Sequence, residues 1–383
     1  MLLIVQLLLS LSLFNCDRLT KDENLNRLST CGTKRTSKVY QGRKAPQSDA
    51  PWSVYMTYFN TNSSATTCTG TVISSRHILT ATHCFTDLTD NGWIENNKAL
   101  NQNSCRGQHY YLEDNEILRK IQYNSSGQTV AKWPERIVLV NACGRKAVAA
   151  NQKNYAVYED FAIVELYEEL AFSPTLHTAC VPNNISVNAD GTALDYYGFG
   201  INPAEAIETG TLRHESLKVL PSRPNFDKAR LFFANNAPEN KMIACSGDSG
   251  GGSVANVNGK TTVAGVLSLT TCDSAQQRTG SQQSELYAAV GYYYQMICQT
   301  TGVCEPNDYD NTHQGYSRQP RPVRPTPAPV VRYLQNPNQQ PAAPEQKTNI
   351  LGLGKNGGSG HLNWRSGLGI GFAMMTMIAY LAV

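Results

Sequence analysis

Residues 39–304 consist of short apolar or aromatic runs separated by Gly, Asn, Pro and Ser, and this pattern limits the chain to a β fold. Two of the runs, residues 253–257 and 261–269, flank Asn258-Gly259. This dipeptide is a strong hairpin signal, because both turn residues must accept a positive φ. A stretch of this length suits a single all-β domain of two packed barrels, which a Tyr-rich run at 286–298 would close with a strand and a C-terminal helix.

The amino-terminal end differs from this middle part. Residues 1–14 are almost wholly apolar, which is typical of a secretory signal peptide, and we assign residues 1–16 to it. The cut fits after Ser12 or after Cys16, and the alternative is a buried apolar helix. Residues 17–38 are polar and lack a long apolar periodicity. We interpret them as a flexible pro-segment.

The carboxyl-terminal end also stands apart. Prolines recur through residues 317–344, so we interpret residues 305–349 as a semi-rigid linker or stalk. Residues 350–383 contain the small residues Asn356-Gly-Gly-Ser-Gly, a polar spacer and an apolar tail. This order is the pattern of a GPI-attachment signal, which we favour over a membrane helix of about 20 apolar residues. Either anchor would attach the protein to the membrane at the outer cell surface.

Other features agree with an extracellular protein. The chain has 11 cysteines, which suits an oxidising compartment. Asn62, Asn124 and Asn184 each begin an Asn-x-Ser glycosylation acceptor. The net charge of +3 is small and dispersed, so we expect no nucleic-acid partner. We also expect no metal and no cofactor, because no cluster of metal ligands stands out.

The strongest local motif is Cys245-Ser-Gly-Asp-Ser-Gly-Gly251. A serine between glycines allows a tight bend that can point two backbone N–H groups at one place. Here these would be the N–H groups of Gly247 and Ser249, with Ser249 as a nucleophile for amide hydrolysis. A glycine-rich turn is the plain alternative for a bare Gly-x-Ser-x-Gly match, but the longer run with Cys and Asp in place argues against it.

Two further segments offer a base and its partner. Leu79-Thr-Ala-Thr-His-Cys84 places His83 beside a cysteine, and Cys68 can staple the same loop. Histidine is the usual general base because its pKa lies near neutrality. Asp160 stands just before an apolar strand and can orient a histidine, although a carboxylate at such a place is common and Glu159 is a rival.

These three segments resemble the histidine, aspartate and serine motifs of the chymotrypsin/trypsin-like serine proteases, and they occur in that family's order. The resemblance covers residues 39–298. It implies two six-stranded antiparallel β-barrels, a protease domain at residues 39–304 and an acyl-enzyme mechanism. It also implies a triad of His83, Asp160 and Ser249, with Gly247 and Ser249 as the oxyanion hole. The partners implied are protein or peptide substrates, an activating protease and protease inhibitors.

The resemblance implies a zymogen as well. Lys38-Val-Tyr-Gln-Gly42 looks like the family's activation site. Cutting after Lys38 would free the amino group of Val39, which in this family pairs with the aspartate before the nucleophile, here Asp248. A buried charge pair is costly unless both partners are present, so such a pair can act as a switch.

The cysteines fit the same family. By similarity to it, the disulfides are Cys68–Cys84, Cys245–Cys272 and Cys31–Cys180. Elimination then leaves Cys105–Cys143 and Cys298–Cys304, provided that Cys16 is removed with the signal peptide.

The chain departs from the family at the specificity pocket. Ile243 stands where trypsins carry aspartate, so a substrate Lys or Arg would be buried without a partner. Thr270 stands where a glycine would leave the pocket open. Ser268 lies on the same strand, and its counterparts hydrogen-bond the triad aspartate. We therefore expect cleavage after small or medium apolar residues.

Two departures lie around the histidine. The segment between His83 and Asp160 is long, and we interpret residues 91–131 as a surface insertion. Thr82 replaces an alanine and has the bulk to crowd the base. Two other functions stay open beside an active protease: a catalytically inactive homologue that serves as an extracellular binding module, and a structural or adhesive surface protein.

Overall fold

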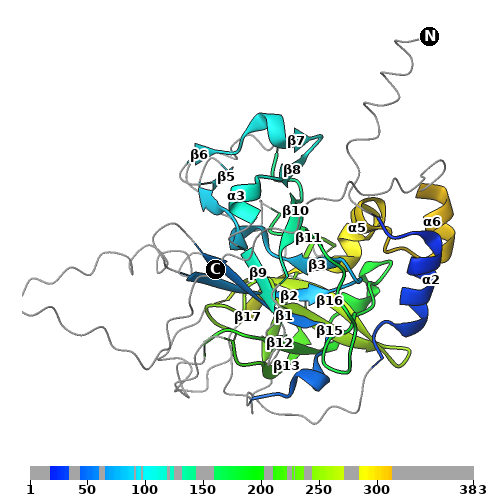
Figure 1. The fold of residues 1–383 in the computed structure, drawn as a ribbon. Helices are drawn as coiled ribbons and strands as arrows, with labels where there is room; N and C mark the ends of the chain where they lie inside the picture. Colours follow the sequence, from blue (N-terminus) through cyan, green and yellow to red (C-terminus); the bar gives the residue numbers. More distant parts are fainter. Residues whose placement is uncertain are drawn as a thin grey trace, which may run out of the picture. The chain divides into compact units, whose positions relative to one another are not determined.

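Figure 1 shows the fold in a computed structural model of the 383-residue chain. The structure describes residues 18–312 except for 34–43, 60–64, 90–91, 96–97, 119–120, 125–131, 144–158, 202–209, 222–226, 228, 237–243 and 271–283. All described residues lie within one compact unit. The expected signal peptide, most of the expected linker and the expected anchor lie outside the described residues.

The described part of the chain is mostly β-structure, as the sequence predicts. Its first half forms an eight-stranded sheet in the order β7-β8-β10-β11-β3-β2-β1-β9. In chain order these strands are β1 (Ser53–Phe59), β2 (Ala65–Val72), β3 (His77–Thr80), β7 (Cys105–Arg106), β8 (His109–Leu112), β9 (Ile121–Asn124), β10 (Pro134–Leu139) and β11 (Ala162–Leu166).

The second half forms a closed six-stranded barrel in the order β12-β13-β14-β17-β16-β15, which agrees with one of the two expected barrels. Its strands are β12 (Ala193–Gly198), β13 (Arg213–Val219), β14 (Leu231–Asn236), β15 (Gly252–Val257), β16 (Lys260–Leu269) and β17 (Ser284–Ala289).

The first sheet is larger than the six strands expected. Residues 91–131 are more than a surface insertion, because β8 pairs with β10 and β9 pairs with β1 within the main sheet. Only β5 (Gly92–Glu95) and β6 (Lys98–Ala99) of this segment form a separate three-stranded sheet, with the preceding strand β4 (Asp87–Thr89).

The hairpin predicted at Asn258-Gly259 is confirmed. Strands β15 and β16 pair from Val257 and Lys260 onward, directly at this dipeptide. Asn258 has φ 52° and Gly259 has φ 81°. Both residues therefore adopt the left-handed conformation that the tight turn requires.

Helices are short and few in the described part of the chain. Four are α-helices: α2 (Lys21–Thr30), α3 (Asn115–Leu118), α5 (Tyr294–Thr301) and α6 (Pro306–Thr312). The single-turn 3₁₀ helices are η1 (Gln47–Asp49), η2 (Thr82–Cys84), η3 (Gln102–Ser104), η4 (Ile185–Asn188) and η5 (Val290–Tyr293). Helix α5 follows β17 through η5, as the sequence predicts, and α6 occupies the first part of the expected linker.

The expectation of a flexible pro-segment is wrong for residues 18–33, because this part contains helix α2. A capping box begins the helix: Thr20 Oγ1 accepts from the backbone N–H of Glu23, and the Glu23 carboxylate accepts from the backbone N–H of Thr20. The apolar pattern of this helix is weak, so periodicity does not reveal it. Polar side chains such as Asn24 instead attach the helix to the rest of the domain.

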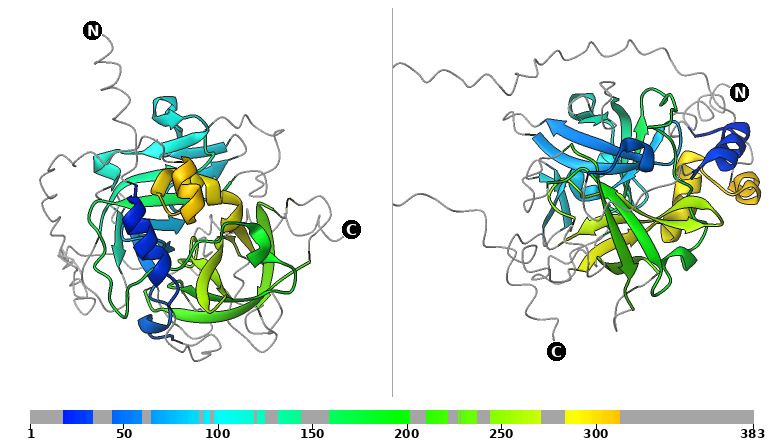
Figure 2. Two further views of the ribbon diagram at one scale, coloured as in Figure 1. Left: turned by 90° about the vertical axis from the view of Figure 1, so that its right-hand side faces the viewer. Right: turned by 90° about the horizontal axis from the view of Figure 1, so that it is seen from below.

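Helix α2 lies beside α5 and α6, as both views of Figure 2 show. Asn24 donates from Nδ2 to the carbonyl oxygen of Cys304 at 2.8 Å, and Arg18 donates to the carbonyl oxygen of Cys298 at 3.0 Å. The backbone N–H of Leu19 donates to the carbonyl oxygen of Thr301 at 2.9 Å. These contacts fix the amino-terminal segment to the carboxyl-terminal end of the domain.

The eight-stranded sheet and the barrel pack against each other through aromatic side chains. The rings of Trp52 and Tyr197 meet edge to face with centroids 5.9 Å apart, and those of Tyr55 and Phe199 lie 5.8 Å apart. Strands β2 and β3 of the sheet contact β15 and β16 of the barrel. The ends of these strands therefore bring together loops that are far apart in the sequence.

Candidate active site

His83 and Asp160 lie at the same end of two neighbouring strands of the first sheet. His83 lies in η2 directly after β3, and Asp160 lies just before β11, which pairs with β3 so that Ala162 faces Thr80. Asp160 Oδ2 lies 2.6 Å from His83 Nδ1, and Asp160 Oδ1 accepts from the backbone N–H of His83 at 2.9 Å. The aspartate thus fixes both the ring and the backbone of the histidine.

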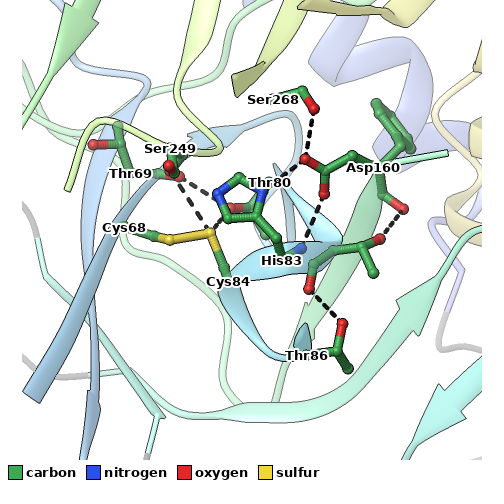
Figure 3. A network of polar contacts seen from close by, with 11 residues as sticks. Cys68, Thr69, Thr80, His83, Cys84, Thr86, Asp160, Ser249 and Ser268 are labelled. Atoms are coloured by element: carbon green, nitrogen blue, oxygen red, sulfur yellow. Dashed lines mark hydrogen bonds and ion pairs between the residues drawn. A yellow bond between two sulfur atoms is a disulfide. The ribbon is translucent and has the colours of Figure 1, made fainter. Parts of the chain in front are cut away.

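The buried carboxylate of Asp160 has a further donor. Ser268, on β16 of the barrel, donates from Oγ to Asp160 Oδ2 at 2.6 Å. Thr82, whose bulk was expected to crowd the histidine, instead donates its hydroxyl to the carbonyl oxygen of Phe161 at 3.0 Å. Figure 3 shows this network around the imidazole. Thr82 therefore ties the histidine turn to the aspartate segment.

The pKa of His83 follows from two opposing effects. Burial alone would lower it, but the charge of Asp160 and the hydrogen bond to Asp160 outweigh burial and raise the pKa above 6.5. The ring remains accessible, because 21 % of the side chain is exposed while the Asp160 side chain is 1 % exposed. A partly exposed imidazole with a raised pKa is suited to accept a proton from a bound group.

Glu159, the rival carboxylate, is directed elsewhere. Its Oε2 accepts a short hydrogen bond from Asn141 Nδ2, and its Oε1 lies 3.7 Å from Arg230. Both of these contacts are with residues other than His83. The structure therefore places Asp160, and not Glu159, against the imidazole.

Ser249 lies on the other side of the histidine in the view of Figure 3. Its backbone carbonyl accepts from the N–H of Thr69 on β2 at 2.8 Å, and Cys84 Sγ lies 3.7 Å from the same carbonyl oxygen. Thr69 also donates its hydroxyl to the carbonyl oxygen of Gly247 at 2.9 Å. The first sheet thus holds the serine loop of the barrel beside the histidine turn.

The backbone around the serine leaves two donors available. Gly247 has φ 96°, a conformation that favours glycine. Within the described residues, the N–H groups of Gly247 and Ser249 donate to no other group of the chain. Paired free N–H groups next to a nucleophile are the usual donors to a developing oxyanion.

Asp248, between these two residues, is directed into the barrel. Its Oδ2 lies 2.8 Å from Nη2 of Arg213 on β13, and both side chains are fully buried. The family resemblance implies that Asp248 pairs with the amino group of Val39. Both Lys38 and Val39 lie outside the described residues, and the cation that the structure places at Asp248 is Arg213.

The expected specificity pocket is described only in part. Thr270 donates its hydroxyl to the carbonyl oxygen of Ala244 at 2.9 Å, while Ile243 lies outside the described residues. Ser268 contacts Asp160 rather than the segment of Ala244. Glu285, a residue that sequence analysis did not single out, accepts from the N–H of Ala244 at 2.9 Å, and burial raises its pKa to about 7.

The described residues contain four of the five expected disulfides: Cys31–Cys180, Cys68–Cys84, Cys105–Cys143 and Cys298–Cys304. Cys245 is disulfide-bonded, and its expected partner Cys272 lies outside the described residues. Among the glycosylation acceptors, Asn184 is exposed. Asn62 and the side chain of Asn124 lie outside the described part.

Three residues of the site escaped sequence analysis: Arg213, Glu285 and Thr69. A signal for the first was present, because Arg213 and Glu215 stand at the same alternating positions as the apolar Leu217 and Val219. A charged pair on the apolar face of a strand indicates an internal ion pair. Thr69 carried no such signal, since a threonine in a strand is ordinary.

No group of three or more metal-binding side chains gathers anywhere in the described ranges. Likewise, no helix among the described residues is long and apolar enough to cross a membrane.

Two curated relatives are named as a serine protease and as a chymotrypsin. The chain is 24 % identical over 252 residues to CLIP domain-containing serine protease B4 of Anopheles gambiae, covering 62 % of this chain and 64 % of that relative. It is 26 % identical over 236 residues to chymotrypsin-C of Mus musculus, covering 58 % and 76 %. The chain thus spans somewhat less than two-thirds of the mosquito relative.

Among solved structures, that of HL collagenase aligns with a TM-score of 0.47 and 16 % identity, covering 70 % of this chain and all of that one. Residues 1–304 match the nematode trypsin-6-like family, and this match spans both β units. The chain therefore belongs to the nematode trypsin-6-like family.

Proposed function

We propose that the protein is a serine endopeptidase with His83, Asp160 and Ser249 as its catalytic triad. The observation that supports this most strongly is the 2.6 Å contact between Asp160 Oδ2 and His83 Nδ1. This contact leaves the other ring nitrogen, Nε2, on the side from which a serine proton can be taken. The curated relatives, one named as a serine protease and one as a chymotrypsin, support the same reaction class.

The proposed reaction has two halves. Ser249 Oγ attacks the peptide carbonyl while His83 Nε2 takes its proton, and the oxyanion accepts hydrogen bonds from the N–H groups of Gly247 and Ser249. His83 then gives the proton to the leaving amine, which leaves an acyl group on Ser249. Water activated by His83 hydrolyses this ester. Asp160 keeps Nδ1 protonated and stabilises the imidazolium.

For specificity, we propose cleavage after small or medium apolar residues. Ile243 offers no carboxylate to a basic substrate side chain. Glu285 lies near the same segment but is fully buried, and its two carboxylate oxygens already accept from Ala244 N–H and from the hydroxyl of Tyr287. A substrate Lys or Arg would therefore lose its hydration without gaining an ion pair. A peptide library that revealed a preference for Arg or Lys would contradict this proposal.

For location, we propose a secreted protein that is held at the outer cell surface. The four described disulfides support an oxidising compartment. The signal peptide and the C-terminal anchor are supported by their sequence patterns. Lys38 is the proposed site of a processing cut by another protease. Release of the protein from cells by a phosphatidylinositol-specific phospholipase would distinguish a GPI anchor from a membrane helix.

The catalytic proposal is tested with a fluorophosphonate probe, which reacts covalently with an activated serine. The protein is first cut after Lys38, so that any processing requirement is met. We expect labelling of the wild-type protein and none of the Ser249→Ala variant. If the cut protein remains unlabelled, the protease proposal fails and a binding role for an inactive homologue is favoured.

A further inference from the structure

The residue before the proposed nucleophile already has a buried cationic partner inside the uncut chain. Asp248 Oδ2 lies 2.8 Å from Arg213 Nη2, and neither side chain has exposed surface. Arg213 projects from β13, a strand of the closed barrel that lies outside the serine loop. The partner is therefore supplied by the frame of the fold rather than by a chain end.

Asp248 is also held by the backbone. Its Oδ1 accepts from the N–H of Gly200 at 2.8 Å, and its Oδ2 accepts from the N–H of Cys245 at 2.8 Å. There is no room beside the carboxylate: a Cβ atom on Gly200 would lie 2.5 Å from Asp248 Oδ2, and one on Gly198 would lie 2.1 Å from Oδ1. The carboxylate fits a closed cradle that ends at Arg213.

The cradle fixes the segment that carries the free N–H groups. Tyr196, on β12, donates its hydroxyl to the carbonyl oxygen of Asp248, and Asp248 N–H donates to the carbonyl oxygen of Cys245 at 2.9 Å. Gly247 and Ser249 are the two neighbours of Asp248 in the chain. Their N–H groups are thus held in place by an aspartate whose side chain is anchored to Arg213.

Asp248 is the carboxylate that pairs with Arg213, although two other buried acids lie nearby. The other buried acids nearby are Glu215 on β13 and Glu285 on β17. Burial raises the pKa of Glu215 well above 4.5, and the charges of Glu285 and Asp248 raise it further, which disfavours a second negative charge beside Arg213. Burial also raises the pKa of Asp248, while Arg213 and the N–H groups of Cys245 and Gly200 lower it.

A second cation would bind unfavourably in the cradle around Asp248. An ammonium group that entered the cradle would lose its hydration and would meet the guanidinium of Arg213 at short range, and both effects are unfavourable in a buried site. The chain just beyond residues 34–43 is already docked beside this arginine. Lys44 forms a β-bridge with Arg213, and the N–H of Ala45 donates to the carbonyl oxygen of Leu212 at 2.9 Å.

We propose that Arg213 is a positioning residue that takes the place of a new amino terminus: it holds Asp248, and through it the N–H groups of Gly247 and Ser249, ready for substrate without a cut after Lys38. This inference rests on the proposed protease function. A cut after Lys38 then serves processing or exposure of the site, and the oxyanion donors are set when the barrel closes.

The first test compares the uncut and the cut protein. The full-length chain carrying Lys38→Gln, which an enzyme specific for lysine cannot cut there, is labelled with a fluorophosphonate beside wild type cut after Lys38. We expect rates that agree within about threefold, because the site is already formed. A rate that is about 100-fold lower in the uncut chain, the size of a lost oxyanion donor, would overturn the inference. If the cut protein is not labelled either, the protease proposal fails, and the second test alone decides the role of Arg213.

The second test does not depend on activity. Amide hydrogen exchange is measured in the uncut chain at Gly200 and Cys245, whose N–H groups donate to Asp248, and at Val263, whose N–H donates to Cys180. In Arg213→Met we expect exchange at Gly200 and Cys245 to rise about tenfold or more while Val263 stays protected. Unchanged exchange at both sites would contradict the role of Arg213.

Two further variants complete the test. Lys218→Met makes the same kind of change at an exposed basic residue of β13 and should leave exchange and labelling as in wild type. Arg213→Lys keeps the positive charge and should restore most of both. If Arg213→Met does not fold, as unprotected Val263 would show, Arg213→Gln is measured in its place, since it removes the charge but keeps a hydrogen-bond donor. Amide exchange at wild-type rates at Gly200 and Cys245 in Arg213→Gln would likewise overturn the inference.

Discussion

Asp160 shows how much of the site depends on a single carboxylate. It accepts from the side chain and the backbone of His83 and from Ser268, so three donors converge on two oxygens. The ring stack next to it, in which Phe161 and Tyr293 lie with centroids 4.2 Å apart, excludes water from this side. The charge of Asp160 therefore acts on His83 in a poorly screened environment.

Replacing this charge tests its effect on the histidine. In Asp160→Asn we expect the activity at neutral pH to fall by about 10³- to 10⁴-fold, because the wrong tautomer of His83 is favoured. The acid limb of kcat/KM should also move to lower pH. In wild type, Asp160 raises the pKa of His83 above 6.5, whereas in the variant burial is left to lower it. The pH profile of peptide hydrolysis provides the measurement.

Glu159→Gln is the matched control, because it neutralises the adjacent carboxylate, which contacts Asn141 and Arg230. Its acid limb should coincide with that of wild type. An unchanged acid limb in Asp160→Asn, or an equal shift in Glu159→Gln, would contradict the assignment of Asp160.

Single residues also mark the limits of sequence reasoning. His83, Asp160 and Ser249 were predicted because each lies in a motif with a specific chemical use. Arg213 was not, although its pairing with Asp248 is the main polar contact of the barrel interior at this site. The sequence places Arg213 on the same face as Leu217 and Val219, but only the fold shows which of the acids it meets.

At the scale of elements, helix α2 is the clearest difference from the sequence prediction. Its packing depends on hydrogen bonds from Arg18, Leu19 and Asn24 to the carboxyl-terminal segment rather than on an apolar stripe. Strands were easier to predict: β11 begins just after Asp160, where an apolar strand was expected, and the Asn258-Gly259 turn lies where it was expected. Strand β9 was missed because its partner β1 is distant in the sequence, and β8 was missed although it pairs with the neighbouring β7 as well as with β10.

The capping box of α2 gives a prediction for stability. Thr20→Ala removes the side-chain acceptor for the N–H of Glu23, and we expect the free energy of unfolding to fall by about 1 kcal/mol. Ser29→Ala, at an exposed position of the same helix, is the control and should change stability little. Urea unfolding followed by tryptophan fluorescence measures both. Equal stability of Thr20→Ala and wild type would show that α2 does not need its cap.

At the scale of the whole molecule, the site forms where two β units meet. The first sheet supplies His83 and Asp160, the barrel supplies Ser249 and Ser268, and Thr69 links the two by bonds to Ser249 and Gly247. The amino-terminal segment is joined to the domain twice, by the contacts of α2 and by Cys31–Cys180. A cut between these contacts and the first sheet therefore releases no fragment.

This linkage is tested by gel electrophoresis of protein cut after Lys38. We expect one band at the full size without reducing agent and a separate amino-terminal fragment with it, because Cys31–Cys180 spans the cut. Cys31→Ser, with the same cut, should lose the fragment under denaturing conditions without reduction. Loss of the fragment from the wild-type protein under those conditions would contradict the disulfide.

The most direct measurement of the proposed chemistry is the trapping of an acyl-enzyme. The protein is mixed with a nitrophenyl ester of an apolar acyl group, quenched in acid within the first turnover, and digested for peptide mass spectrometry. We predict an acyl mass on the peptide that contains Ser249, and no such mass in the Ser249→Ala or His83→Ala variants. An acyl group found on another residue, or equal acylation of the Ser249→Ala variant, would contradict the central assignment.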